Sequence, residues 1–221
     1  MIDLFLYGGP LFMFPLFIAS VGVIAVAIER TVHYRRAAVD PQTLTDEIEA
    51  AWEQGGLAAA REVAATTPGP LARVWSEGLN SPQLPASLMR ERLEGVACEE
   101  IRRLEKHLSH LEVVAPVAPL IGILGTVAGM IIAFGGVAGG LSAGVGVDGE
   151  RLTAGIAKAL VTTGAGLGVA IPATIVHHYL RARVERFTED LEQTMRDLFV
   201  TLAQRSAARR PAREATPVAS R

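Results

Sequence analysis

The sequence has few of the residue types on which catalytic and metal sites depend. Its 221 residues include one cysteine, Cys98, so no disulfide can form within the chain, and a lone thiol in a charged segment fits the reducing cytoplasm. His107 and His110 lie in a charged segment, and the adjacent His177 and His178 point to different faces of a helix. We interpret Cys98 as a space-filling residue, and we expect neither a metal site nor a cofactor.

The chain also lacks an excess of positive or of negative charge. The 21 basic and 23 acidic residues leave a net charge of −2, and Lys and Arg do not gather on one soluble patch. This pattern argues against nucleic-acid binding. The apolar segments contain no arrangement of nucleophile, base and metal ligands, so an enzyme is a weak alternative.

Charged side chains are missing entirely from residues 113–134, a run of 22 residues. At about 1.5 Å per residue such a run crosses a hydrocarbon core of about 30 Å. A second apolar stretch covers residues 10–28, and a third covers residues 152–180. We therefore predict transmembrane helices at 10–28, 113–138 and 152–180, in a chain that forms an all-α membrane protein.

Basic residues predict the orientation of these spans. None precedes the first span, whereas arginines and lysines follow the first span, precede the second and follow the third. By the positive-inside rule we expect the N-terminus outside and the C-terminus inside, in the cytoplasm. The predicted organisation is then an external N-terminus (1–9), a cytoplasmic helical region (29–112), an external loop (139–151), a cytoplasmic helix (181–205) and a disordered tail (206–221).

The cytoplasmic region is predicted to be helical. Asp40-Pro41 is a start signal, Gly55-Gly56 an end signal, and residues 66–70 a further break. From Pro85 onward apolar residues recur at helical spacing with no stop signal, so we expect one helix to run unbroken into the second span. Two of the three transmembrane helices are thus predicted to extend into long cytoplasmic helices.

Small residues mark the second and third spans. Gly122, Gly125 and Gly129 cluster on one span, and on the other Gly155, Ala159 and Thr163 are expected to share a face. A second pair, Gly164 and Gly168, is four residues apart. Such spacing allows helix backbones to approach closely, and packing within the chain or between subunits is the plainer interpretation.

Hydroxyl groups interrupt the same spans at Thr126, Thr162 and Thr163. Each can bond back to a carbonyl of its own helix, or the three can line an inner surface and contact a polar group from elsewhere. Lys158 is the ionisable residue well inside the third span. It lies one to two turns from the outer end, so snorkelling to the interface is favoured over a place in a pathway.

Several segments resemble the ExbB/TolQ/MotA proton-channel family. PLIGILGTVAGMIIAF (119–134) and GIAKALVTTGAGLGVAIPA (155–173) are similar to its two signature helices. GGPLFMFPL (8–16) and IER (28–30) resemble ExbB-type members more than TolQ or MotA. The resemblance covers all three spans in order, whereas the cytoplasmic region shows no distinctive match.

The resemblance implies a pentamer whose second and third helices line a pore. Single-span helices of a dimeric ExbD/TolR-type partner would sit inside it, each bringing an Asp that carries protons, and a TonB-type protein would use the energy. By motif, Thr126 and Thr163 match the pore threonines, and Pro172 matches the proline of the third helix. Lys158 stands where some ExbB proteins have Glu, and His177-His178 replaces the usual Tyr-Asn.

Other interpretations stay open at this point. Within the family these are a TolQ-like role in envelope maintenance and a sodium-driven stator. Outside it, a membrane scaffold that conducts no ion would use the same small-residue faces and long helices.

Overall fold

The structure is a computed structural model that describes residues 9–142 and 149–208. Within these ranges the chain is helical, and the helical stretches Pro10–Thr66, Leu108–Gly139 and Gly149–Arg205 are long and apolar enough to cross a membrane. This confirms the predicted fold class. The predictions for residues 1–8, 143–148 and 209–221 concern parts of the chain outside the described residues. The helices are α2 (Pro10–Ala37), α3 (Pro41–Thr66), α4 (Pro70–Asn80), α5 (Ala86–Glu105), α6 (Leu108–Ser142) and α7 (Gly149–Ala208).

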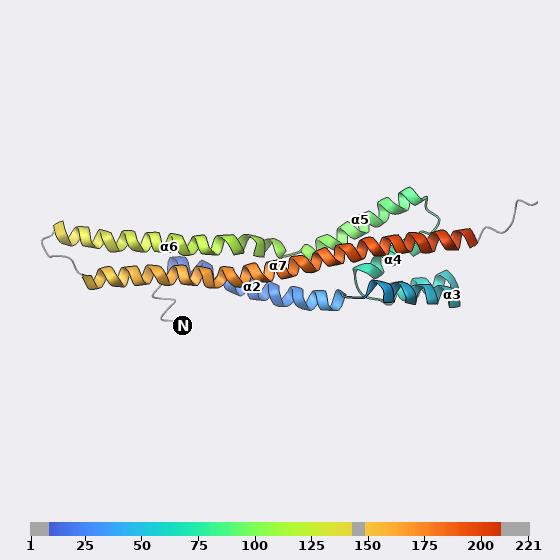
Figure 1. Cartoon of the computed structure of the whole chain (residues 1–221), viewed down its shortest axis with the longest axis horizontal. Coiled ribbons are helices and arrows are strands. Elements are labelled where there is room, and N and C mark those ends of the chain that lie inside the picture. Colours follow the sequence, from blue (N-terminus) through green and yellow to red (C-terminus); the bar gives the residue numbers. More distant parts are fainter. Residues whose placement is uncertain (1–8, 143–148, 209–221) are drawn as a thin grey trace, which may run out of the picture. The chain divides into compact units, whose positions relative to one another are not determined.

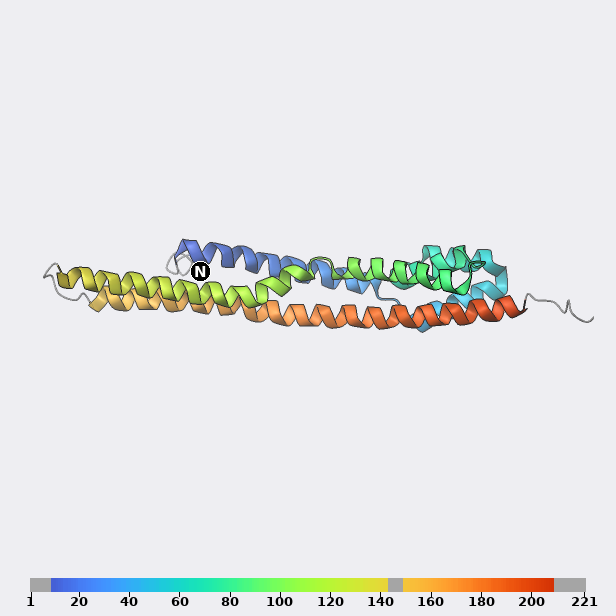
Figure 2. The ribbon, with the colours of Figure 1, turned by 90° about the horizontal axis from the view of Figure 1, so that it is seen from above.

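One compact unit contains the apolar spans, drawn from residues 1–32 and 105–182. In it α6 and α7 lie side by side and antiparallel, with the first part of α2 along them (Figures 1 and 2). Leu16 of α2, Ala118 of α6 and Ala170 of α7 form a small buried cluster. Most large side chains instead point outward, and such faces suit lipid or other protein helices.

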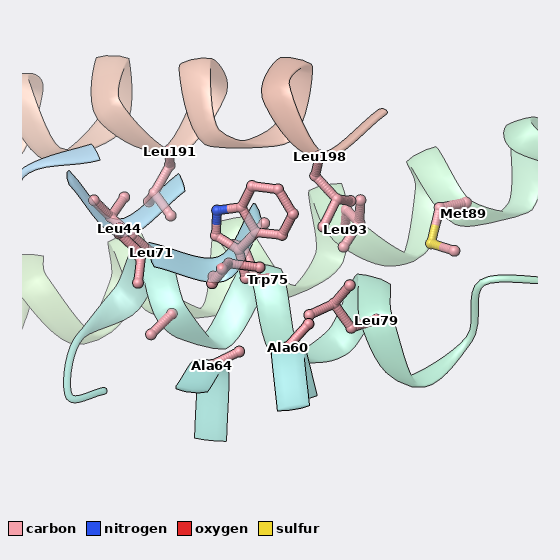
Figure 3. Packing of buried hydrophobic residues seen from close by; sticks show 13 residues of the cluster. Leu44, Ala60, Ala64, Leu71, Trp75, Leu79, Met89, Leu93, Leu191 and Leu198 are labelled. Carbon is pink, nitrogen blue, oxygen red and sulfur yellow. The ribbon is translucent and has the colours of Figure 1, made fainter. Parts of the chain in front are cut away.

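The second unit takes residues 33–104 and the part of the chain from 183 onward. Its hydrophobic core is built around Trp75 of α4, which is fully buried. Figure 3 shows Leu44 of α3, Leu93 of α5 and Leu198 of α7 around this indole. Four helices thus close over one core, so this unit has the buried interior of a folded domain.

Local signals in α3 act much as the sequence predicts. The Asp40 carboxylate accepts a hydrogen bond from the backbone N–H of Thr43 at 2.9 Å and caps the helix that begins at Pro41. Gly56 has φ +70°, a left-handed conformation that suits glycine, and it kinks α3. The helix resumes after the kink, so Gly55-Gly56 bends α3 where an end was predicted.

The prediction of one unbroken helix from Pro85 into the second span is wrong. Helix α5 ends at Glu105 and α6 begins at Leu108. His107 between them has φ +69°, which is uncommon for a residue with a side chain. Its Nδ1 lies 3.3 Å from Nη2 of the buried Arg30 and 3.2 Å from Oε2 of Glu29. These polar contacts with the end of α2 stabilise the break.

Helices α6 and α7 also extend beyond the predicted spans, at the ends that approach each other in sequence. We expected a loop at residues 139–151, but α6 continues to Ser142 and α7 begins at Gly149. Gly135, Gly136 and Gly139 are helical in this stretch. Glycine weakens a helix in water, yet transmembrane helices tolerate it because no water competes for their backbone groups.

Candidate functional site

The candidate site is built on the contact between α6 and α7. Three α6 glycines, Gly122, Gly125 and Gly129, face α7 at this contact. A Cβ on Gly122 would lie 3.1 Å from the carbonyl oxygen of Thr162, and one on Gly129 would lie 2.9 Å from Cβ of Ala159. The two backbones therefore approach to a distance that only glycine allows.

Gly166 also belongs to this contact, although it is not among the packing residues predicted from the sequence. A Cβ there would lie 2.7 Å from the carbonyl oxygen of Ala118 and 3.0 Å from Cα of Gly122. The sequence contains a pattern that indicates this face of α7, because small residues recur there at spacings of three and four. These residues are Gly155, Ala159, Thr162, Gly166, Ala170 and Ala173. The packed stripe therefore runs through Thr162, and the predicted face through Thr163 is rotated from it.

Gly164 and Gly168 lie elsewhere on α7. Apart from the neighbouring backbone of α7, a Cβ added at either position would meet no atom of the described residues within 4 Å. Pro172 is exposed and lies inside α7, where it cannot donate the helical hydrogen bond to the carbonyl of Gly168. The structure does not bring these three residues into the α6–α7 contact.

The three predicted threonines have different surroundings. Thr163 is half-buried, and its hydroxyl donates to the carbonyl oxygen of Gly122 across the contact at 3.1 Å. Thr162 is 1% exposed, and its hydroxyl donates to the carbonyl of Lys158 at 3.3 Å. Thr126 donates to the carbonyl of Ile123 in its own helix at 2.6 Å. Thr163 thus joins two helices, and Thr162 lies within their packing.

Thr126 and Thr163 lie on the same side of the helix pair, opposite α2. Ile121 of α6 and Val169 of α7 pack in the cluster that contains Leu16 of α2. An α-helix turns by about 100° per residue, so on α6 Thr126 lies to one side of Gly122 and Ile121 lies to the other side. Thr163 is likewise rotated from Gly166 in the opposite sense to Val169. We call the surface that contains Thr126 and Thr163 the threonine face.

Lys158 lies away from the threonine face. A Cβ on Gly9 would lie 3.6 Å from Cε of Lys158, which places this side chain beside the start of α2. Lys158 is exposed, at the level where the first apolar helix begins. This position favours snorkelling to the nearer membrane interface over contact with a group at the threonines.

Comparison with known proteins gives a consistent result. Residues 66–193 match the model of the MotA/TolQ/ExbB proton channel family. The chain is 34% identical over 185 residues to a putative biopolymer transport protein ExbB-like 1 of Synechocystis, covering 81% of this chain and 70% of the relative. It is 29% identical to a putative ExbB homolog of Methanothermobacter thermautotrophicus (79% and 62%) and 32% identical to the Tol-Pal system protein TolQ of Haemophilus influenzae (58% and 55%). The match covers less than two thirds of the last two relatives.

Proposed function

This chain belongs to the MotA/TolQ/ExbB proton channel family, and we propose that it is the ring-forming subunit of a proton-driven motor in the bacterial inner membrane. It is a multi-pass membrane protein of a family of transport subunits, which is not a family of enzymes. The proposed orientation, with a periplasmic N-terminus and a cytoplasmic C-terminus, rests on the distribution of basic residues.

One observation carries the proposal: the threonine face is polar but has no titratable group of its own at this depth. Thr126 and Thr163 offer hydroxyls there, and residues 113–134 and 159–176 contain no acidic residue. A group that takes up and releases protons at this depth must then come from another chain. A single-span partner of the ExbD/TolR type, with an Asp in its helix, meets this requirement.

The physical chemistry of a carboxylate explains how the pair would work. In an apolar pore the ionised form is costly, so the acid stays protonated until it reaches a polar or hydrated position. A hydroxyl can both donate and accept a hydrogen bond, so a threonine level in the ring is such a position. Two partner helices in a five-fold ring would meet unequal surroundings, and alternating protonation would step the partner around the ring.

The names of relatives suggest what the motor powers. Several relatives are called ExbB, which supports an ExbB-like role that supplies energy through a TonB-type protein to outer-membrane transport. Similarity to a Tol-Pal system protein supports a second candidate, a TolQ-like role in envelope maintenance. The threonine face is compatible with both roles.

Native mass spectrometry of the protein purified with a candidate partner tests the proposal. The partner would be a short single-span protein with an intramembrane Asp, encoded beside this chain. We expect five copies of this chain to hold two copies of the partner. A homo-oligomer or monomer that retains no partner would contradict the proposal and favour a membrane scaffold.

A further inference from the structure

Polar side chains continue along the threonine side of α7 toward its cytoplasmic end. Thr174 follows Thr163 after 11 residues, which is about 16 Å along the helix and only about 20° around it. His178 follows one turn later and stays within about 60° of Thr163. His178 is exposed, and it lies just past Val176, where the apolar run of the third span ends.

Glu112 of α6 reaches the same level from the neighbouring helix. The contact between Ala118 and Gly166 fixes the register of the two antiparallel helices. Glu112 lies six residues before Ala118 on α6, which is about 9 Å along the helix axis. Thr174 lies eight residues after Gly166 on α7, which is about 12 Å in the same direction. Glu112 is exposed, and its rotation about the α6 axis places it on the same side as Thr126. Three polar groups therefore lie on the same side of the helix pair, within about 9 Å along its axis, at the inner end of the threonine face.

We propose that Glu112, Thr174 and His178 form the inner exit of the proton path, with His178 as the proton acceptor. This inference rests on the proposed function. The O–H bond of the partner's carboxylic acid breaks, directly or through water, and an N–H bond forms at the neutral imidazole of His178. The imidazolium then releases the proton to cytoplasmic water, which restores neutral imidazole.

Each group has a defined part in this exit. Imidazole is the side chain that ordinarily gains and loses a proton in the physiological range. The Glu112 carboxyl oxygens can accept hydrogen bonds from water at this end. Thr174 donates its hydroxyl hydrogen to the carbonyl of Ala170 at 2.9 Å, which leaves its oxygen lone pairs as acceptors for water.

Several other titratable or charged groups lie at this end of the unit, and they contribute to the electrostatic surroundings of His178. The ring of His177 lies 5.5 Å from that of His178, centroid to centroid, and Arg181 follows on the next turn. His110 is the useful control, because it is an exposed imidazole at this end of α6 but is rotated toward the α2 side. The remaining groups are Glu29 and Arg30 on α2, with Glu105, Lys106 and His107 at the α5–α6 junction.

The test is proton uptake into proteoliposomes that contain the complete complex with its single-span partner. A voltage is imposed, the pH of the compartment at the cytoplasmic face is varied, and a pH-sensitive dye reports the flux. We expect the wild-type flux to change with that pH. His178→Gln should lower the flux about ten-fold and remove this dependence, as expected on losing a proton-transfer group. His178→Glu, which restores a proton acceptor, should recover part of the flux.

The controls separate the possible failures. His110→Gln should leave the flux unchanged, and size-exclusion chromatography should show that every variant retains the partner. A His178→Gln complex that conducts like the wild type would overturn the exit while leaving the proposed function standing, and an equal loss in His110→Gln would also overturn it. A wild-type complex that retains its partner but takes up no protons would overturn the proposed function, and the exit with it.

Discussion

The hydroxyl of Thr163 on α7 donates a hydrogen bond to the carbonyl oxygen of Gly122 on α6, with 3.1 Å between the two oxygens. In the helical ladder this carbonyl also accepts from the amide of Thr126. Gly122 has no side chain to hold α7 away, so one carbonyl oxygen connects both threonines of the face. The packing of the spans and their polar chemistry therefore depend on the same residues.

Replacing Thr163 by Val should reduce proton flux strongly while the complex still assembles. The shape is kept and the hydroxyl is lost, and the missing hydrogen bond costs about 1 kcal/mol. Thr163→Ser should retain most of the flux. Thr188→Val is a matched control, because the Thr188 hydroxyl donates within its own helix, to the carbonyl of Val184, in the second unit. Normal flux in Thr163→Val would count against a role for the hydroxyl.

Gly166→Ala should destabilise the membrane unit, whereas Gly164→Ala should not. The new methyl at Gly166 would press on the carbonyl oxygen of Ala118, and this backbone can yield only if the helices move apart. We expect a cost of about 1–3 kcal/mol from this overpacking. Thermal unfolding in detergent measures it. If Gly164→Ala were equally destabilising, Gly164 would have to pack against another copy of the chain.

Tyr34→Phe should lower the stability of the second unit, which contains residues 33–104. The buried Tyr34 hydroxyl donates to the carbonyl of Leu104 at 2.7 Å, near the end of α5. Removing it leaves this carbonyl without its donor, at a cost of about 1 kcal/mol and about 2–4 °C in Tm. Tyr34→Leu should cost more, because the edge-on contact with the ring of Phe187 is also lost. Equal Tm values for wild type and Tyr34→Phe would contradict this account.

Asp190→Asn should stabilise the protein at neutral pH. Burial, then the charges of Glu189 and Asp40, raise the pKa of Asp190 above its ordinary value of 3.8. The folded state thus binds this proton more tightly than the unfolded chain, so ionised Asp190 lowers stability above the raised pKa, and the penalty is relieved as pH falls toward 3.8. Tm measured against pH should show a gain for Asp190→Asn that shrinks on acidification. Asp46→Asn, at an exposed position on α3, is the control.

Much of the fold could be predicted because its signals are local. The three apolar spans follow from uninterrupted apolar runs, and the start of α3 follows from Asp40-Pro41. The family was identified from two short motifs and is confirmed by the comparison. These features need no knowledge of what each residue contacts.

The break at His107 could not be predicted in the same way. A left-handed histidine is unfavourable in isolation, and its partners Glu29 and Arg30 lie more than 70 residues away in the chain. The rotation of the packed stripe onto Thr162 and Gly166 depends on which face of α7 meets α6. Sequence spacing gave candidate faces, and only the contact between helices selects one.

The most direct test of the central claim is ion flux through the purified wild-type complex in proteoliposomes under an imposed voltage. The account predicts proton uptake that needs both this chain and its partner and that stops when the intramembrane Asp of the partner is replaced by Asn. Uptake of sodium without protons, or no uptake from a complex that retains its partner, would contradict the account.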